Sequence, residues 1–210
     1  MPTTQPTDPT DDDPETRRAR LHLVSAGSDG PAGDSVPSKL TLRHRMRAFA
    51  AAADLPADAA LSHVSAACLL GLPIVDDELL HMPVQVTRPG PGRGYRRRGV
   101  HVRSGRLDSD EITGVDGVPV TTVSRTLVDL GRWATLESAV AAVDAALRDG
   151  LVSRDDLDDA VARAFGSPGV ARARIALSFA DGRSRTVDES RARVAMRWPN
   201  TAAPDLPSIR

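Results

Sequence analysis

The chain contains 210 residues, of which 40% are hydrophobic and 26% are charged, so it is long enough for one or two small folded domains. Its 27 basic and 28 acidic residues leave a formal net charge of −1, so any attraction to a polyanion has to come from a local patch. No stretch of ~18 apolar residues exists, which excludes a membrane-spanning helix, and the single cysteine, Cys68, excludes an internal disulfide bond.

The first segment, residues 1–38, holds six prolines and seven acidic residues but only three arginines. This composition buries too little apolar surface to offset the entropy lost on ordering, so we expect a disordered acidic, proline-rich tail. An acidic start ahead of any apolar stretch is the reverse of a secretory signal. We therefore expect a cytoplasmic protein with no membrane partner.

The next segment shows the residue spacing of helices. Apolar residues recur on one side from Leu40 to Ala53, and Leu55-Pro56 ends this first helix. A second helix begins at Ser62, a good N-cap, and ends at Gly71. The residues predicted to face inward from the first helix are Leu40, Leu42, Met46, Phe49, Ala50 and Ala53.

The spacing then changes to alternation. Apolar residues alternate with others over residues 82–87 and again over 100–103, which predicts two half-buried strands. The loop between them, residues 89–94, contains prolines and glycines that cannot continue a strand pairing. We therefore expect a β-hairpin with an arginine-rich tip, followed by a short strand over residues 118–120.

The rest of the chain is expected to be helical up to residue 197, with a polar, proline-containing disordered tail over 198–210. The sequence thus predicts an α+β fold with N-terminal helices, a small antiparallel sheet with a basic hairpin, and a helical C-terminal half. The predicted late helices run from Thr121 or Thr122 to Gly131, Leu136 to Arg148, Ser153 to Phe165, Val170 to Phe179 and Thr186 to Met196.

Six phrases of the sequence carry a family resemblance through their order and spacing. They are Leu61-Ser62-His63-Val64-Ser65-Ala66-Ala67, Leu70-Gly71-Leu72, Pro119-Val120-Thr121, Ser124–Leu130, Ala139–Leu147 and Asp188-Glu189-Ser190-Arg191. Together they resemble actinobacterial proteins that couple an AbiEi-type antitoxin module to a C-terminal endonuclease-like domain of the very-short-patch-repair kind. The likeness covers roughly residues 40–195.

The resemblance also bears on catalysis. Glu189 matches the first acid of the family's nuclease domain, which needs further carboxylates to hold a divalent metal. Only 21 residues follow Glu189, and they contain one acid, Asp205, and no lysine or histidine. We therefore expect a truncated nuclease-like domain and a chain that is not an enzyme.

On this interpretation the chain divides into four segments. They are a disordered tail (1–38), a helix pair plus β-hairpin module (39–131), a helical region that ends at the start of the truncated nuclease-like domain (132–197) and a second disordered tail (198–210).

The strongest functional signal is a run of seven arginines without an acidic residue between Leu79 and Leu107. Such a local positive field attracts the phosphate backbone of duplex DNA, and an arginine fork can bind one phosphate with two N–H groups. Arg88, His101 and Arg103 are expected along the outer face of the hairpin. The predicted DNA-binding residues are Arg88, Arg93, Arg96, Arg97, Arg98, His101, Arg103 and Arg106.

Other polar residues point to structural roles. Arg125 and Asp129 lie four residues apart on one predicted helix and are expected to pair, joining the helical part to the hairpin part. Asp144 lies on an otherwise apolar helix and is expected to pair with a nearby arginine. His63 is expected to form a local hydrogen bond. No histidine spacing suits zinc and no serine has a hydrolase arrangement, so we expect no metal, no cofactor and no catalytic residue.

The sequence therefore predicts a non-catalytic, AbiEi-antitoxin-like regulatory module that contacts DNA through its arginine-rich hairpin. Three alternatives remain open. The chain could be an inactive, truncated remnant of a very-short-patch-repair-like endonuclease, or an antitoxin that binds an acidic protein partner, such as a cognate toxin, without DNA. The basic segment could also be a solvated loop with no specific role. Nothing in the sequence indicates an oligomeric state.

Overall fold

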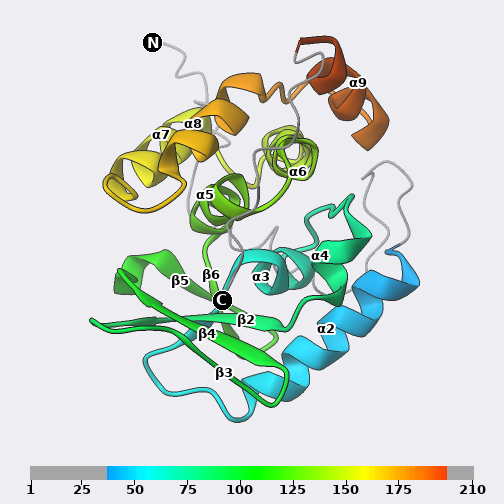
Figure 1. Cartoon of the computed structure of the whole chain (residues 1–210). Helices are drawn as coiled ribbons and strands as arrows, with labels where there is room; N and C mark the ends of the chain where they lie inside the picture. Colours follow the sequence, from blue (N-terminus) through cyan, green and yellow to red (C-terminus); the bar gives the residue numbers. More distant parts are fainter. Residues whose placement is uncertain (1–36, 198–210) are drawn as a thin grey trace, which may run out of the picture.

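The computed structural model describes residues 37–197 of the chain. The tails expected at residues 1–38 and 198–210 lie outside this range, apart from Pro37 and Ser38. A β-sheet forms one layer and most of the helices form the other, with α5 (Val123–Trp133) lying between the sheet and the outer helices (Figure 1). The α+β class predicted from the sequence is confirmed.

The sheet has six strands in the order β3-β4-β2-β1-β6-β5. Two neighbouring pairs, β1–β6 and β2–β4, are parallel, and the other three pairs are antiparallel. The sheet is therefore larger than the small antiparallel sheet that the sequence predicted, and it is mixed. The strands are β1 (Ala60–Leu61), β2 (Val84–Pro89), β3 (Tyr95–Arg97), β4 (Val100–Gly105), β5 (Ile112–Val115) and β6 (Val118–Thr121).

The predicted hairpin between residues 82–87 and 100–103 is wrong in its pairing. β2 and β4 run parallel, with Val84 opposite Val100, and the antiparallel partner of β4 is β3. After β2 the chain passes the position of β4 and forms β3 at the edge of the sheet. It then returns as β4, which lies between β2 and β3 and pairs with both. Gly94 permits this path, because a Cβ atom at this position would lie 2.4 Å from the carbonyl oxygen of Val102.

The helical predictions hold well where capping residues mark the ends. The side chain of Ser153 accepts a hydrogen bond from the backbone N–H of Asp156 at the start of α7, and Thr122 and Thr135 cap α5 and α6 in the same way. The remaining helices are α2 (Lys39–Ala52), α3 (His63–Leu69), α4 (Asp77–His81), α6 (Leu136–Arg148), α7 (Arg154–Arg163), α8 (Val170–Phe179) and α9 (Val187–Arg197), with a 3-10 turn η1 (Ser109–Glu111).

The inward face predicted for α2 is partly wrong. Met46 is 72% exposed and Leu42 is 46% exposed, whereas His44 and Ala48 are fully buried. His44 lies inside because both of its ring nitrogens find partners, the carbonyl oxygen of Leu80 at 3.0 Å and the Ser65 hydroxyl at 2.8 Å. The packed side of α2 therefore includes a polar residue, His44, which is stabilised there by its two buried hydrogen-bond partners.

The core consists mainly of leucine, valine and alanine side chains shared between the sheet and the helical layer. Leu61 of β1, Val120 of β6 and Leu127 of α5 are all completely buried in one continuous cluster. Among the helices within residues 37–197, none combines the length and the apolar character that crossing a bilayer requires.

Candidate nucleic-acid interface

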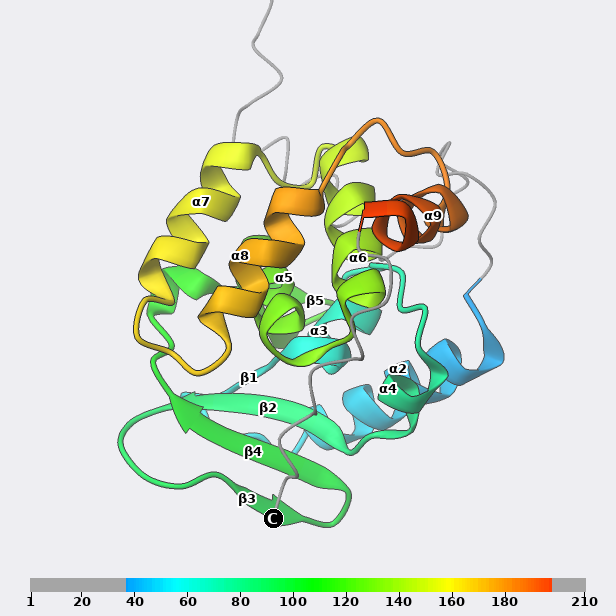
Figure 2. The ribbon, with the colours of Figure 1, turned by 45° about the horizontal axis from the view of Figure 1, so that its top comes forward.

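The arginine-rich stretch, residues 88–106, lies at one edge of the sheet, and we call it the basic ribbon. It contains the end of β2, a loop, and the strands β3 and β4. Figure 2 shows β3 at the outer edge of the sheet, on the side of the molecule away from α6, α8 and α9. The ribbon is therefore an exposed margin and is not covered by the helical layer along β3.

The tip of the ribbon is a tight turn between β3 and β4. Arg98 and Gly99 have φ angles of 46° and 79°, the left-handed conformations that a two-residue type I′ hairpin turn requires. Arg93, Arg96, Arg97 and Arg98 are all exposed, and none of their side chains forms a hydrogen bond or an ion pair with another residue within 37–197. These four arginines are therefore free to bind an external anion.

The strand pairing distributes these cations over two faces of the sheet. Arg96 lies opposite His101, whereas Arg97 lies opposite Val100, and directly opposed residues project to the same face. Consecutive residues of a strand point to opposite faces, so Arg96 and Arg97 cannot both contact one flat surface. A single phosphate backbone would have to follow the edge of the sheet to meet both.

His101 does not lie on an outer face as the sequence predicted. Its side chain is buried, with only 8% of the residue exposed, and its Nδ1 atom has no hydrogen-bond partner among the described residues. Burial and the charges of Arg103 and Arg96 lower the pKa of His101 to about 4, so the imidazole is neutral at pH 7. The prediction was wrong because both faces of β4 are packed.

Arg103 also points inward. Its guanidinium carbon lies 4.8 Å from the centre of the Trp133 ring at the end of α5, and its Nε atom has no hydrogen-bond partner among residues 37–197. Burial lowers the pKa of Arg103, although Asp129 partly opposes this effect. The contact with Trp133 was missed from the sequence, since no local spacing relates the two residues.

The two ends of the ribbon differ from its middle. Arg88 is half-buried, and its Nε atom has no hydrogen-bond partner within the described chain. Arg106 is exposed and pairs with Asp108 at 2.7 Å. An exposed pair of this kind contributes little to stability, but it neutralises part of the positive field. Of the eight predicted residues, only Arg93 and Arg96–Arg98 are exposed and have side chains without an ion pair to any residue in the described range.

A buried ion-pair cluster joins α5 to η1, just before β5. As predicted, Arg125 pairs with Asp129, at 3.0 Å, and it also binds Glu111 at 2.7 Å. Arg132 donates to the other oxygen of the completely buried Asp129 at 2.8 Å. Burial would raise the pKa of Asp129, but the nearby cations and the hydrogen bond from Arg125 keep it below its ordinary value. The cluster is structural, because its charges satisfy one another.

His63 lies at the junction of β1 and α3 with a positive φ of 53°, which is strained for a residue other than glycine. Its Nδ1 atom is 2.9 Å from the Ser62 hydroxyl, which confirms the expected local hydrogen bond, and Ser62 also accepts a hydrogen bond from Thr87. Burial lowers the pKa of His63 to about 3, so it is neutral at pH 7. Its Nε2 atom has no partner among the described residues.

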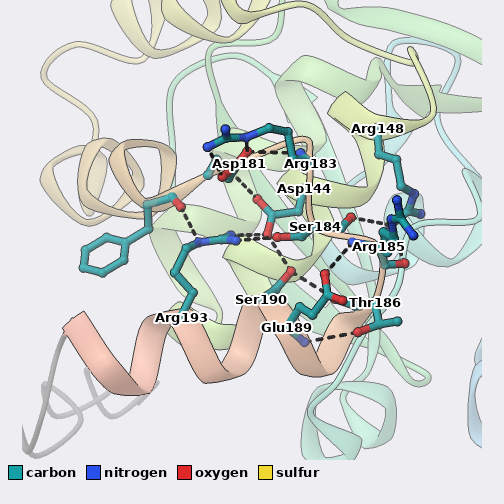
Figure 3. Close-up of polar contacts among 12 residues, drawn as sticks. Asp144, Arg148, Asp181, Arg183, Ser184, Arg185, Thr186, Glu189, Ser190 and Arg193 are labelled. Atoms are coloured by element: carbon teal, nitrogen blue, oxygen red, sulfur yellow. Dashed lines mark hydrogen bonds and ion pairs between the residues drawn. The ribbon is translucent and has the colours of Figure 1, made fainter.

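A second buried carboxylate, Asp144 of α6, holds α9 against the helical layer (Figure 3). Arg193 of α9 pairs with Asp144, which confirms the predicted arginine partner. The Ser190 hydroxyl donates to the same carboxylate at 2.5 Å, and the backbone N–H of Asp181 donates at 2.6 Å. Within the described part of the chain, both oxygens of the buried Asp144 carboxylate are thus occupied by internal donors.

Glu189, the residue that matches a nuclease acid, caps the first turn of α9. Its carboxylate accepts the backbone N–H of Arg185 at 2.8 Å, while its own N–H donates to the Thr186 hydroxyl at 3.2 Å (Figure 3). Among the residues that the structure describes, no cluster of three histidine, cysteine or acidic side chains is arranged to hold a metal ion. Helix capping therefore accounts for the position of Glu189.

The chain is similar to one described family and to two curated relatives. A family model described as the AbiEi antitoxin C-terminal domain matches residues 43–179, which is more than half of the 210 residues. Uncharacterized protein MT2308 of Mycobacterium tuberculosis (strain CDC 1551 / Oshkosh) and Uncharacterized protein Rv2248 of Mycobacterium tuberculosis (strain ATCC 25618 / H37Rv) are each 33% identical to it over 142 residues. The match covers 68% of this chain and 50% of each relative, so the chain spans about half the length of these relatives. No solved structure matches the chain significantly.

Proposed function

Because the chain belongs to the family of the AbiEi antitoxin C-terminal domain, we propose that it is a non-catalytic regulatory module of a toxin–antitoxin system that contacts duplex DNA through the basic ribbon. The family supports the antitoxin role. The DNA contact is supported by the charge and geometry of the ribbon, and the cytoplasm is where such a module would act.

One observation carries the DNA proposal. Arg93, Arg96, Arg97 and Arg98 are exposed at one edge of the sheet and have no carboxylate partner in residues 37–197. Elsewhere in the described chain, arginines such as Arg125, Arg163 and Arg183 are paired with acids. A cluster of unpaired cations keeps its positive electrostatic field, whereas the field of a paired cation is largely cancelled by the carboxylate beside it.

The mechanism that follows is displacement of counterions from the phosphate backbone. Each arginine that neutralises a phosphate releases a condensed cation from the duplex, and this release drives binding at low salt. Contacts to phosphate fix the position of a protein on a duplex but do not read its sequence. The ribbon therefore supplies affinity and orientation.

The direct test is binding of the full chain to a short duplex at low salt, with the variant R96A/R97A/R98A and the control R43A/R174A/R185A. Both variants remove three exposed arginines that have no ion pair within residues 37–197, but those of the control lie outside the ribbon. We expect the ribbon variant to bind at least tenfold more weakly and the control to bind nearly as the unmodified chain does. Equal losses in both would refute a role for the ribbon. Adding Mg²⁺ should leave the duplex intact.

A second candidate function, binding of a toxin protein, is favoured by a groove on a different surface. Leu40, Met46 and Leu80 line it, with Arg43, Arg47 and His81 beside them. Met46 is 72% exposed and lies between Arg43 and Arg47 in the sequence, and an apolar side chain flanked by cations suits an acidic amphipathic partner. If Met46→Glu abolishes binding to a partner protein while R96A/R97A/R98A does not, the groove is the protein-binding surface.

A further inference from the structure

Besides its exposed arginines, the basic ribbon has a polar row on the face of the sheet that meets α3 and α5. Gln85 of β2 lies opposite His101 of β4, which in turn lies opposite Arg96 of β3. Thr87 lies opposite Arg103 in the next row. Opposed residues share a face, so Arg96, His101 and Arg103 all project from the same side.

This row contains buried nitrogen atoms with no partner. Nδ1 of His101 and Nε of Arg103 are buried and form no hydrogen bond with any residue in 37–197, and the same is true of Nε2 of His63. Buried polar atoms in folded proteins are nearly always satisfied, and each exception needs an explanation such as a ligand. Gln85 is not an exception, because its side-chain oxygen accepts the N–H of Val64 at 3.1 Å.

The charges around the row do not balance. Arg103 has the Trp133 ring beside it, which carries no net charge and cannot act as a carboxylate does. Asp129 is close enough to raise the pKa of Arg103, but its two oxygens already accept hydrogen bonds from Arg125 and Arg132. Arg96 adds a second cation at the exposed end of the row. The net charge around Arg96 and Arg103 is therefore positive. Because this region is half-buried, an anion there would interact with the two arginines more strongly than an anion in water would.

We propose that Arg96, His101 and Arg103 bind one phosphate group on this face of the sheet, beside Trp133. Each arginine offers N–H donors in a planar fork that matches phosphate oxygens, and the neutral imidazole offers one N–H. The proposal that the phosphate comes from a duplex backbone rests on the proposed function. The site itself does not, because it is defined by the protein's own unpaired groups.

The test uses inorganic phosphate with the full chain, followed through the imidazole resonances of His101. We expect a saturable change in these resonances and a rise in the pKa of His101 from about 4, because Arg96 and Arg103, which lower it, would face a bound anion. Arg103→Met keeps an apolar stem against Trp133 and should weaken phosphate binding about tenfold. Arg96→Ala changes an exposed residue, so it should fold normally and weaken binding by a smaller factor.

Arg174→Ala is the matched control, since it removes an exposed cation of the helical half and should leave phosphate binding unchanged. If phosphate does not perturb His101, or if Arg103→Met and Arg96→Ala bind it as Arg174→Ala does, the proposal is overturned. A parallel titration with duplex identifies the source of the phosphate: Arg103→Met should weaken duplex binding if the backbone supplies it. Failure of duplex binding alone would contradict the proposed function and leave the phosphate result standing.

Discussion

The guanidinium carbon of Arg103 lies 4.8 Å from the centre of the Trp133 ring, so the middle of the basic ribbon is attached to the end of α5. A cation over an aromatic face is stabilised by about 0.5–1 kcal/mol at exposed sites and about 2 kcal/mol when desolvated. Both residues are half-buried, which places this contact between the two limits. Arg103 therefore helps to pack the ribbon against the helical layer as well as contributing charge.

A double-mutant cycle measures this contact. Trp133→Leu and Arg103→Met should each lower the free energy of unfolding, and the double variant should lose less than the sum by about 1 kcal/mol, the coupling expected for a partly buried cation–π pair. Urea denaturation of the four proteins gives the coupling directly. Strict additivity would mean that the two side chains do not stabilise one another.

Asp129 anchors the ion-pair cluster between α5 and η1. Asp129→Asn should lower the free energy of unfolding by about 3–5 kcal/mol, because it removes the negative charge that satisfies the half-buried Arg125 and Arg132. Asp188→Asn is a matched control, since Asp188 is 92% exposed and its pairing with Arg191 spans 3.8 Å. A loss at Asp129 no larger than that of the control would contradict the structural role of the cluster.

The stability of the fold should fall as the pH drops below 6.5. Burial lowers the pKa of His63 from 6.5 to about 3, so between these values the unfolded chain binds a proton that the folded chain does not. The stability is fully present above pH 6.5 and is lost at about 1.4 kcal/mol per pH unit below it. His101, whose pKa is lowered to about 4, acts in the same direction.

His63→Asn tests this origin, because asparagine tolerates the positive φ of 53° and does not titrate. Unfolding free energies measured at several pH values between 7 and 4.5 should show a shallower slope for the variant than for the unmodified chain. Parallel slopes would mean that His63 is not the group responsible.

The path of the ribbon depends on Gly94. A Cβ atom there would lie 2.4 Å from the Val102 carbonyl oxygen, so Gly94→Ala should displace β3 and weaken duplex binding several-fold without changing any charge. Gly105→Ala, at the end of β4, is the control, because nothing lies within 4 Å of a Cβ atom at that position. Equal affinities for the two variants would mean that charge alone matters and that the geometry of the ribbon does not.

Local signals in the sequence predicted most of the helices. Ser153 followed by acids marks the start of α7, and Thr122 marks the start of α5, because capping chemistry acts within one turn. The strands β1, β3 and β5 were missed. β1 has two residues and β3 has three, which is too few for a measurable alternation, and in β5 Gly114 stands where alternation would place an apolar residue. The strand pairing also failed, because β4 enters between β2 and β3 through contacts that no local spacing encodes.

The candidate site was predicted in the same partial way. Glycine and proline around Arg93 predicted an exposed loop, and Arg96–Arg98 are exposed as expected. Alternation along β4 correctly placed His101 and Val102 on opposite faces of the strand. It could not show that the polar face, like the apolar face, is buried. Arg103 contacts Trp133, about 30 residues later in the sequence, so only the fold reveals that Arg103 points inward.

The salt dependence of duplex binding tests the central claim most directly. The logarithm of the binding constant should fall linearly with the logarithm of salt concentration, with a slope of about −0.9 for each neutralised phosphate. The account predicts that R96A/R97A/R98A has a slope shallower by about 2 to 3 than the unmodified chain, while R43A/R174A/R185A keeps the original slope. An unchanged slope for the ribbon variant would contradict the claim that these arginines contact DNA.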